Sequence, residues 1–363
     1  MTRMKQLGLI AAVTVLFVPA STNAAACSPL DCAPSQFLIA NGSLLATRGS
    51  AQSPIRVIDL RTGRTRLRLP AGIVSGETLV SRRGATLEWR DLVDGARLGT
   101  AQLHVNGVYA LTGLSQDGTE AVLTRTTLGT TTFAIVSPER EHFVELRGGN
   151  WGFDALRDSN LVLVRYMRFG YQVRLYNLTS RALDRRPLKD PGESALISGV
   201  PLARASSAGG RYVFTLYAGP NGNAMIHELD LEKATAHCID LPGGGDFGAA
   251  LTYGLAVAGN TLWAVSPGYG RVVGIDVARQ RVREVFDFKA TAWTQNSGMA
   301  ALSPDRSRIA VTDAQHVWLV DLSRRNVRLV GPHVAIALAF STDGNRLWGI
   351  GERSRVFSLR AHG

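Results

Sequence analysis

The sequence predicts an all-β fold in which a four-stranded antiparallel unit is repeated around a ring. Three observations lead to this prediction. A strand–turn–strand pattern recurs along the chain, tight-turn motifs recur between its copies, and no segment has the length and periodicity of a useful helix. One such unit cannot bury both faces of its sheet alone, so we expect the units to stack as blades of a β-propeller.

The first repeated pattern is an alternating apolar strand that ends in Asp-Leu or a close variant, followed by a polar turn and a second strand. Its seven copies begin at Ile55, Leu87, Phe133, Val173, Ile226, Val272 and Val317. The spacing between first-strand ends runs from 32 residues (Leu60 to Leu92) to 53 residues (Leu178 to Leu231), which brackets the length of a four-stranded blade. The longest interval contains residues 191–210, whose Gly, Ser and Pro content predicts an inserted loop.

The second pattern is an apolar strand, a tight turn and another strand. It reads ALTGLSQDGTEAVLTR from Ala110, ALSPDRSRIAVTD from Ala301 and ALAFSTDGNRLWGI from Ala337. The Asp of each turn can accept hydrogen bonds from nearby backbone amides, and Gly118 and Gly344 can adopt the positive φ that other residues resist. Together the two patterns give four strands per repeat.

The number of blades depends on how the ring closes. An eighth, partial unit spans 336–359 and lacks an outer strand. Either the N-terminal strand 37–40 completes this unit and closes a seven-bladed ring, or the unit stands as an eighth blade. We favour seven blades, with eight as the alternative. Closure of the ring matters because it removes exposed sheet edges.

The SxDG turn, the xLxV strand after it and the Asp-Leu hairpin resemble WD40-like repeats of the PD40 or YVTN type, over residues 36–360. The resemblance implies a propeller of four-stranded blades. Strict WD40 repeats fit less well, because Trp89-Arg90-Asp91 and Trp318–Asp321 only approximate the Trp-Asp signature and the Gly-His element is absent. These motifs describe turns and packing, so they specify architecture and leave activity open.

The N-terminus has the pattern of a secretory signal peptide. Arg3 and Lys5 precede an apolar run at 7–18, and small residues follow up to Ala26. The run is shorter than the roughly 20 residues that span a bilayer, so we predict cleavage after Ala26. The predicted organisation is a signal peptide at 1–26, a short segment at 27–35 and a single propeller domain at 36–363. The mature protein would then be exported by a bacterium and be secreted, periplasmic or associated with the cell envelope.

Cleavage after Ala26 would make Cys27 the first mature residue. Two alternatives follow for it: a small disulfide loop with Cys32, or lipidation, which alone would place the protein on a membrane. The third cysteine, Cys238, lies in an alternating strand, and we expect it to be a small buried apolar residue.

The charge is positive and comes mostly from arginine. Loss of Arg3 and Lys5 with the signal peptide lowers the formal charge from +11 to +9. A positive field favours anionic partners such as acidic envelope components or phospholipid head groups. An exported chain without a basic helix or an aromatic platform gives no reason to expect nucleic-acid binding.

No motif assigns catalytic, cofactor or metal-binding residues, and we predict none. The seven histidines form no HxH or HExxH motif: His104, His142, His227, His237, His316, His333 and His362. The glycine runs at 148–149 and 243–245 are typical of turns between blades. Trp151, Trp263, Trp293 and Trp348 are expected in the core between sheets.

Two functional hypotheses follow. The first is a non-catalytic binding or scaffold propeller, monomeric, that engages a protein or an anionic envelope component on one rim. The alternative is an exported propeller enzyme, such as a lactonase-like hydrolase, a lyase or a quinone-dependent dehydrogenase, with its site in the central channel. The second requires carboxylates, Asn and His from different blades to converge near the axis.

Overall fold

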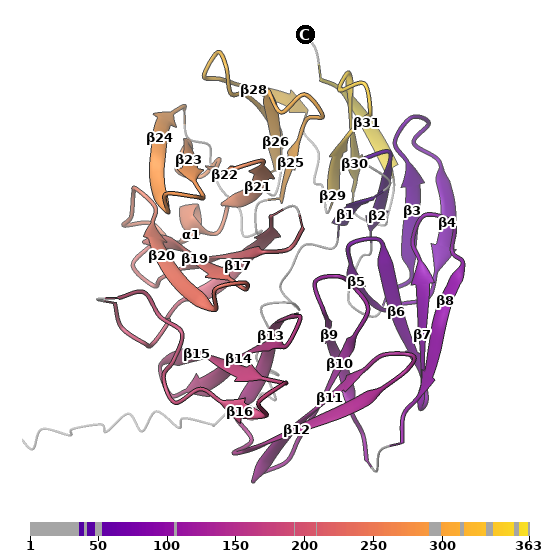
Figure 1. Cartoon of the computed structure of the whole chain (residues 1–363). Helices are drawn as coiled ribbons and strands as arrows, with labels where there is room; N and C mark the ends of the chain where they lie inside the picture. Colours follow the sequence, from indigo (N-terminus) through magenta and orange to yellow (C-terminus); the bar gives the residue numbers. More distant parts are fainter. Residues whose placement is uncertain are drawn as a thin grey trace, which may run out of the picture.

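The computed structural model of the protein is a ring of antiparallel sheets (Figure 1). It describes residues 36–39, 42–47, 53–104, 107–191, 193–207, 209–289, 299–312, 316–331, 337–351 and 356–361. Within these residues there are eight sheets, of which the first seven have four strands and the last has three. We number these sheets as blades 1 to 8 in chain order. The all-β propeller fold predicted from the sequence is therefore confirmed.

The strands of each blade follow one another in chain order from the centre of the ring outward. The strands of blades 1 to 4 are β1 (Gln36–Ile39), β2 (Leu44–Thr47), β3 (Ile55–Asp59), β4 (Thr65–Leu69), β5 (Ile73–Ser75), β6 (Thr78–Arg83), β7 (Thr86–Asp91), β8 (Arg97–Gln102), β9 (Ala110–Leu114), β10 (Ala121–Thr126), β11 (Thr130–Val136), β12 (Glu141–Arg147), β13 (Trp151–Arg157), β14 (Asn160–Met167), β15 (Gly170–Asn177) and β16 (Ala182–Leu183).

Blades 5 to 8 repeat this arrangement, with one short helix, α1 (Phe247–Ala250), before blade 6. Their strands are β17 (Val200–Ser206), β18 (Tyr212–Ala218), β19 (Ala224–Asp230), β20 (Thr235–Asp240), β21 (Gly254–Ala258), β22 (Thr261–Ser266), β23 (Arg271–Asp276), β24 (Arg281–Asp287), β25 (Met299–Leu302), β26 (Arg308–Thr312), β27 (Val317–Asp321), β28 (Asn326–Gly331), β29 (Ala337–Phe340), β30 (Arg346–Ile350) and β31 (Val356–Arg360). No helix in the described part of the chain is long and apolar enough to cross a membrane.

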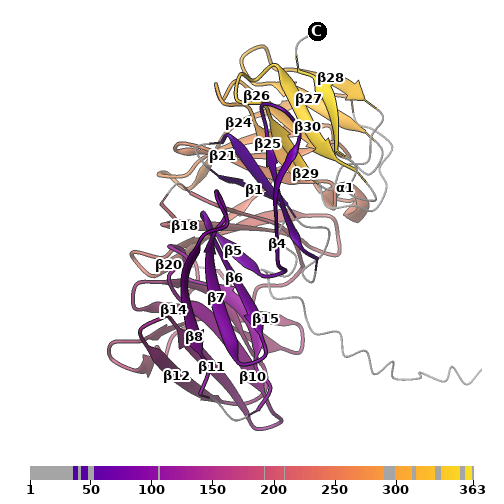
Figure 2. The same cartoon turned by 90° about the vertical axis from the view of Figure 1, so that its right-hand side faces the viewer.

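The hairpins predicted from the sequence are the outer hairpins of blades 1 to 7. The copy that begins at Ile55 forms β3 and β4, and the copy that begins at Val317 forms β27 and β28. The SxD turns connect the two inner strands of blades 3, 7 and 8. Figure 2 views the ring from the side of blades 1 and 2 and shows how strongly the strands of a blade twist.

The preference for seven blades is wrong, and the ring has eight. The expected strand at 37–40 corresponds to β1, which pairs with β2 in its own blade, Phe37 opposite Ala46. The hairpin β3–β4 needs two inner strands to complete blade 1, and β1 and β2 supply them. The N-terminal strand is therefore not available to the last unit, which stands alone as the three-stranded blade 8.

The inserted loop of the fifth unit is shorter than the Gly, Ser and Pro content suggested. Residues Val200–Ser206 are β17, the innermost strand of blade 5, which pairs with β18. The longer connection runs from Asp184 to Gly199, between β16 and β17. It follows β15 through isolated bridges, Val173 to Leu188 and Tyr171 to Ile197.

The core consists of apolar side chains packed between neighbouring blades, and a separate buried cluster fills each of the eight interfaces. Strand β18 illustrates the alternation. Phe214 faces blade 6, whereas Val213 and Tyr217 face blade 4. Each blade thus buries both faces of its sheet, as period-2 alternation in a stacked sheet requires.

The ring closes between blades 8 and 1 through side chains. Leu45, Ile58 and Leu60 of blade 1 form one cluster with Trp348 and Ile350 of blade 8. The Trp348 Nε1–H donates a 2.6 Å hydrogen bond to the carbonyl oxygen of Leu60. Its ring lies against Gly63, where a Cβ would fall 2.4 Å from Cζ3, so the closing tryptophan requires glycine there.

We therefore expect Trp348→Ala to lower the free energy of unfolding by about 3–5 kcal/mol, because it removes a buried aromatic ring and leaves a cavity at the closure. Trp348→Phe keeps part of the packing and loses the bond to Leu60, so its cost should be about 1–3 kcal/mol. Urea unfolding followed by circular dichroism measures both. Equal stability of the wild type and Trp348→Ala would contradict closure through this residue.

Candidate functional site

The two edges of the ring differ in chemistry. One edge carries the SxD turns, whose polar groups are bonded within each turn. In blade 7, the Ser303 hydroxyl donates to Asp305 at 2.6 Å and accepts from the Arg308 amide at 2.9 Å. Blades 3 and 8 repeat this geometry. Because hydrogen bonds from the Ser303 and Ser307 hydroxyls stabilise its charged form, the pKa of Asp305 falls to about 2.

The opposite edge carries the turns between second and third strands and the connections between blades. Here large apolar side chains project from the tips of blades 3 and 4 and from the connection that leads into blade 3. Val108 is 88% exposed, Phe169 is 72% exposed, Met167 is 44% exposed and Leu128 is fully exposed. Isolated exposed apolar residues are ordinary, but several together at loop tips mark an interaction surface.

Backbone contacts hold these tips together. The Gly148 amide donates to the Gly129 carbonyl at 2.8 Å, which joins the turn of blade 3 to the connection into blade 4. Asn150 and Tyr166 then exchange hydrogen bonds of 2.7–2.8 Å, which joins that connection to the end of β14. The segment before blade 3 belongs to the same surface, because Gly107 lies against the Arg125 guanidinium.

Arginines accompany the apolar tips. The Arg165 guanidinium lies 5.4 Å from the centre of the Trp151 ring, and that of Arg168 lies 5.0 Å from the Phe169 ring. The segments 107–109, 125–130, 147–151 and 165–170 contain four arginines and no Asp or Glu. We call this surface the rim patch and define it by Val108, Arg125, Leu128, Arg147, Arg165, Met167, Arg168 and Phe169.

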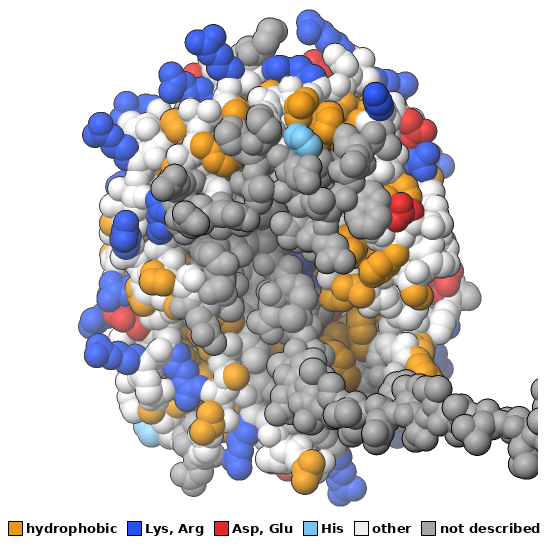
Figure 3. All heavy atoms as spheres, turned by 180° about the vertical axis from the view of Figure 1, so that it is seen from behind, with side chains coloured by type: hydrophobic (Ala, Val, Ile, Leu, Met, Phe, Trp, Pro, Cys, Tyr) orange, Lys and Arg blue, Asp and Glu red, His pale blue; other side chains and the backbone are white. Residues whose placement is uncertain are grey.

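The positive field of the rim patch extends into the interface between blades 3 and 4. Burial, followed by the charge of Arg165, lowers the pKa of Arg174 on the neighbouring strand. Positive charge is also widespread elsewhere on the surface. Figure 3 shows one face of the molecule, where Lys and Arg side chains project around much of the outline and acidic side chains are fewer. The rim patch combines this charge with exposed apolar groups.

A buried polar cluster lies near the inner strands, between blades 4 and 5. Arg204 Nη1 donates to Asp154 Oδ1 at 2.6 Å, and Nη2 donates to the Asp154 carbonyl oxygen at 3.0 Å. Both side chains are nearly inaccessible, and the hydroxyl of Thr215 accepts a further bond from Nη1 at 3.3 Å. The imidazole of His227 is buried beside this ion pair, opposite Thr215 in the sheet.

The other histidines lie apart. His237 Nδ1 is 2.5 Å from Asp190 Oδ2, the ring of His316 packs edge-on to Trp318, and His104 lies 3.7 Å from Glu141. His333 and His362 lie outside the described residues. In the part of the chain that the structure describes, no three His, Cys, Asp or Glu side chains are grouped so as to hold a metal ion.

The glycine and tryptophan predictions are confirmed where the structure describes them. Residues 148–149 form the connection between blades 3 and 4, and 243–245 lie between β20 and α1. Trp151, Trp263 and Trp348 are buried in interfaces between blades. Trp293 lies outside the described residues.

Cys238 lies in the outermost strand of blade 5, as a free thiol that is half-buried rather than fully buried. Burial raises the pKa of this thiol to about 11, so it is a poor nucleophile at neutral pH. The predicted cleavage residue Ala26, and Cys27 and Cys32 with their alternative fates, lie outside the described residues and remain predictions.

No protein-family model matches the chain, and no curated protein matches its sequence. Solved structures match its fold. The Dos1 propeller has 10% sequence identity and a TM-score of 0.53, with 90% of this chain and 92% of that one covered. The C-terminal WD40 domain of Sif2 has 15% identity and a TM-score of 0.51 (88% and 93% covered). Dipeptidyl peptidase 4 of Porphyromonas gingivalis has 11% identity and a TM-score of 0.55 (88% and 56% covered).

These similarities establish the fold, and the proteins that share it include a WD40 domain and a peptidase. The chain is a β-propeller built from WD40-like repeats. It has eight blades.

His227 gives the blade 4–5 cluster a measurable signature. Burial and the neighbouring Arg204 lower the pKa of its imidazole from 6.5 to about 4, against an opposing effect of Asp154. The unfolded chain therefore binds a proton at this residue between about pH 6.5 and 4, and the folded chain does not.

We therefore expect the free energy of unfolding to fall as the pH is lowered through this window, and His227→Gln to remove that part of the decline. Urea unfolding of both proteins at intervals between pH 7 and pH 4 measures the difference between the two curves. Parallel curves would show that the pKa of His227 is the same in the folded and the unfolded chain, and would contradict its burial as a neutral imidazole.

Proposed function

We propose that this chain is an exported, non-catalytic binding propeller that holds a protein partner against the rim patch. The observation that carries the proposal is the set of exposed apolar side chains among arginines at the tips of blades 3 and 4. Interfaces are enriched in aromatic residues, Met and Arg, and this patch offers Phe169, Met167 and four arginines.

The chemistry of the patch defines the partner. Four arginines without a carboxylate in the same segments favour acidic groups, and Leu128 and Val108 require apolar side chains to cover them. We therefore propose a protein segment in which acidic and large apolar residues alternate. Arg165 and Arg168 are held over aromatic rings, so part of the entropy cost of ordering these long side chains is met before binding.

A selection from a displayed peptide library on the intact protein tests this function. We expect acidic and apolar peptides to be enriched, and their affinity to fall about tenfold or more in the double variant Leu128→Ser with Phe169→Ser. The matched control is Val285→Ser with Leu329→Ser, because these residues are 41% and 49% exposed on outer strands of blades 6 and 7.

Peptides that bind the control and the rim variant equally would contradict the rim patch as the binding surface. Vesicles of zwitterionic and anionic phospholipid serve as the competing probe. If the protein floats with these vesicles, the rim variant does not, and no peptide is enriched, the rim patch binds a membrane surface and the proposal of a protein partner is wrong.

Export is a separate part of the proposal, supported by the signal-peptide pattern at 1–26. We expect intact-mass analysis of the protein, expressed in a bacterium with its full N-terminus, to show loss of residues 1–26. A mass lower by two hydrogens that reverts on reduction would indicate a disulfide of Cys27 with Cys32, and an added acyl mass would indicate lipidation. A full-length mass in the cytoplasmic fraction would contradict export.

A further inference from the structure

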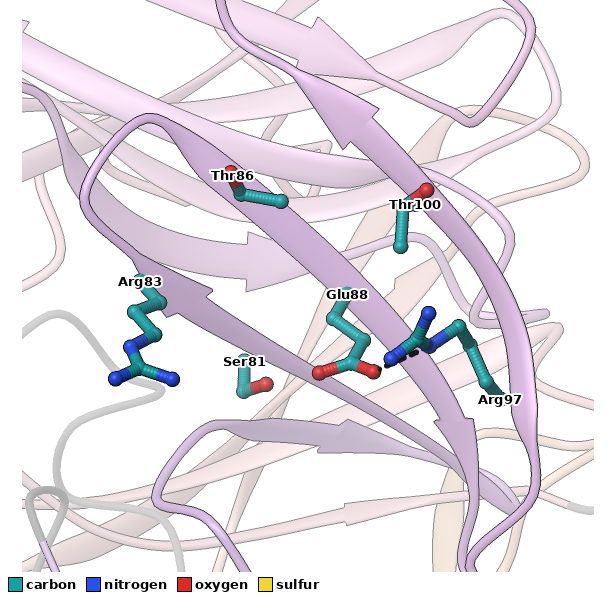
Figure 4. A pocket seen from close by; sticks show the side chains of 6 residues that line it. All are labelled: Ser81, Arg83, Thr86, Glu88, Arg97 and Thr100. Carbon is teal, nitrogen blue, oxygen red and sulfur yellow. Dashed lines mark hydrogen bonds and ion pairs between the residues drawn. The ribbon is translucent and has the colours of Figure 1, made fainter.

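A polar cavity of about 230 Å³ lies on blade 2. Its lining comes from three adjacent strands: Ser81 and Arg83 of β6, Thr86 and Glu88 of β7, and Arg97 and Thr100 of β8 (Figure 4). The register places Ser81 opposite Glu88, and Glu88 opposite Thr100, so these side chains form one row across the sheet.

The cavity opens where the apolar packing between blades 1 and 2 ends. On β6, Leu79 belongs to the cluster shared with blade 1. The next residues on the same face are Ser81 and Arg83, because side chains alternate along a strand. On this face of β6, the apolar side chain of Leu79 is therefore followed by the polar side chains of Ser81 and Arg83.

The carboxylate of Glu88 is held in place by two arginines. Arg97 Nε and Arg90 Nη2 both donate to Oε1, at 2.7 Å and 2.8 Å. Oε2 accepts no hydrogen bond from the described residues, and Figure 4 shows it turned toward Ser81. Glu88 thus offers the cavity a fixed acceptor for hydroxyl groups.

The remaining groups supply positive charge and hydroxyls. Arg83 makes no ion pair with the described residues, and the hydroxyls of Ser81 and Thr100 make no hydrogen bond with them. Thr86 donates to Gln102 Oε1 at 2.9 Å, which leaves its oxygen free to accept. Arg90 and Arg97 both bind Glu88, so Arg83 is the lining arginine that can pair with one anionic group of a ligand. The negative charge of Glu88 disfavours a second anionic group placed beside it.

We propose that this cavity binds a small hydroxylated monocarboxylate, of the class of the sugar acids. The ligand carboxylate pairs with Arg83, which can bind it through two parallel N–H donors. Ligand hydroxyls donate to Glu88 Oε2 and bond with Ser81 and Thr100. The volume is below that of sites for drug-sized ligands and suits on the order of a dozen non-hydrogen atoms. This site stands independently of the rim patch, because it shares no residue with it.

The same chemistry occurs in a free sugar acid and at the end of an acidic polysaccharide. Isothermal titration of the intact protein with glucuronate, and separately with a short oligouronate, distinguishes these sources. Tighter binding of the oligouronate would indicate that the ligand is an acidic polysaccharide. Equal binding of the two would indicate that it is the free sugar acid. Three compounds serve as comparisons. Glucose lacks the carboxylate, acetate lacks the hydroxyls, and glucose 6-phosphate carries a second negative charge.

We expect glucuronate to bind more tightly than these three compounds, and Arg83→Gln to weaken its binding about tenfold or more. Arg64→Gln, at an exposed turn of blade 1, is the matched control and should bind as the wild type does. Glu88→Gln should reduce the preference for glucuronate over glucose 6-phosphate, because it removes the charge that opposes a dianion.

Circular dichroism of each variant separates loss of binding from loss of fold. No binding of glucuronate or oligouronate by the folded wild type would overturn the proposal. Two further results would overturn it: glucuronate binding that Arg83→Gln leaves unchanged, or binding of acetate and glucose 6-phosphate as tight as that of glucuronate. Either result would reflect general attraction of anions to a basic protein.

Discussion

The structure depends on one constraint: each blade must bury both faces of its sheet against its neighbours. The eight apolar clusters, one in each interface, meet this requirement, and the alternation along strands such as β18 supplies side chains to both sides. The interface between blades 8 and 1 meets it without a shared strand, because Trp348 covers blade 1 and bonds to Leu60. Sequence variation is then least costly on the edges of the ring and on the outermost strands, where solvent replaces a neighbouring blade.

The same constraint explains how the blade 4–5 interface tolerates charge. A buried ion pair loses its hydration, and the attraction between the two charges offsets this cost only if hydrogen bonds also satisfy the remaining polar groups. Arg204 and Asp154 meet that condition through the Thr215 hydroxyl and the Asp154 carbonyl. Irregular pairing at Phe153–Ala155 in β13 makes this arrangement available, because a bulge changes the direction of the side chain beside it. His227 then stays neutral beside a pair that is already complete.

The sequence predicted features that are local and missed those that join distant segments. The Asp-Leu hairpins and SxD turns were found because their side chains bond within a few residues of themselves, as Ser303 and Asp305 do. Local patterns do not reveal how the ring closes, because closure rests on contacts such as that of Trp348 with Leu60, which lie 288 positions apart. The Gly, Ser and Pro residues around Arg204 predict a loop, although this residue lies in β17 because β18 pairs with it. In the sequence, the rim patch is indicated only weakly, by the apolar residues Leu128 and Phe169 at the tips of turns.

A common feature links the rim patch to the cavity on blade 2. The second strands of blades 2, 3 and 4 run past the end of their packing: β6, β10 and β14 each end in exposed residues after a buried stretch. The second strands of blades 5 to 8 remain buried to their last residue. A strand that outruns its packing keeps its backbone pairing, so it holds unburied side chains on a rigid support, which is what a binding surface needs. Arg83 and Arg125 belong to such ends, and Met167 terminates the longest of them. Because the second strands of all blades end at the same edge of the ring, both proposed surfaces lie on that side.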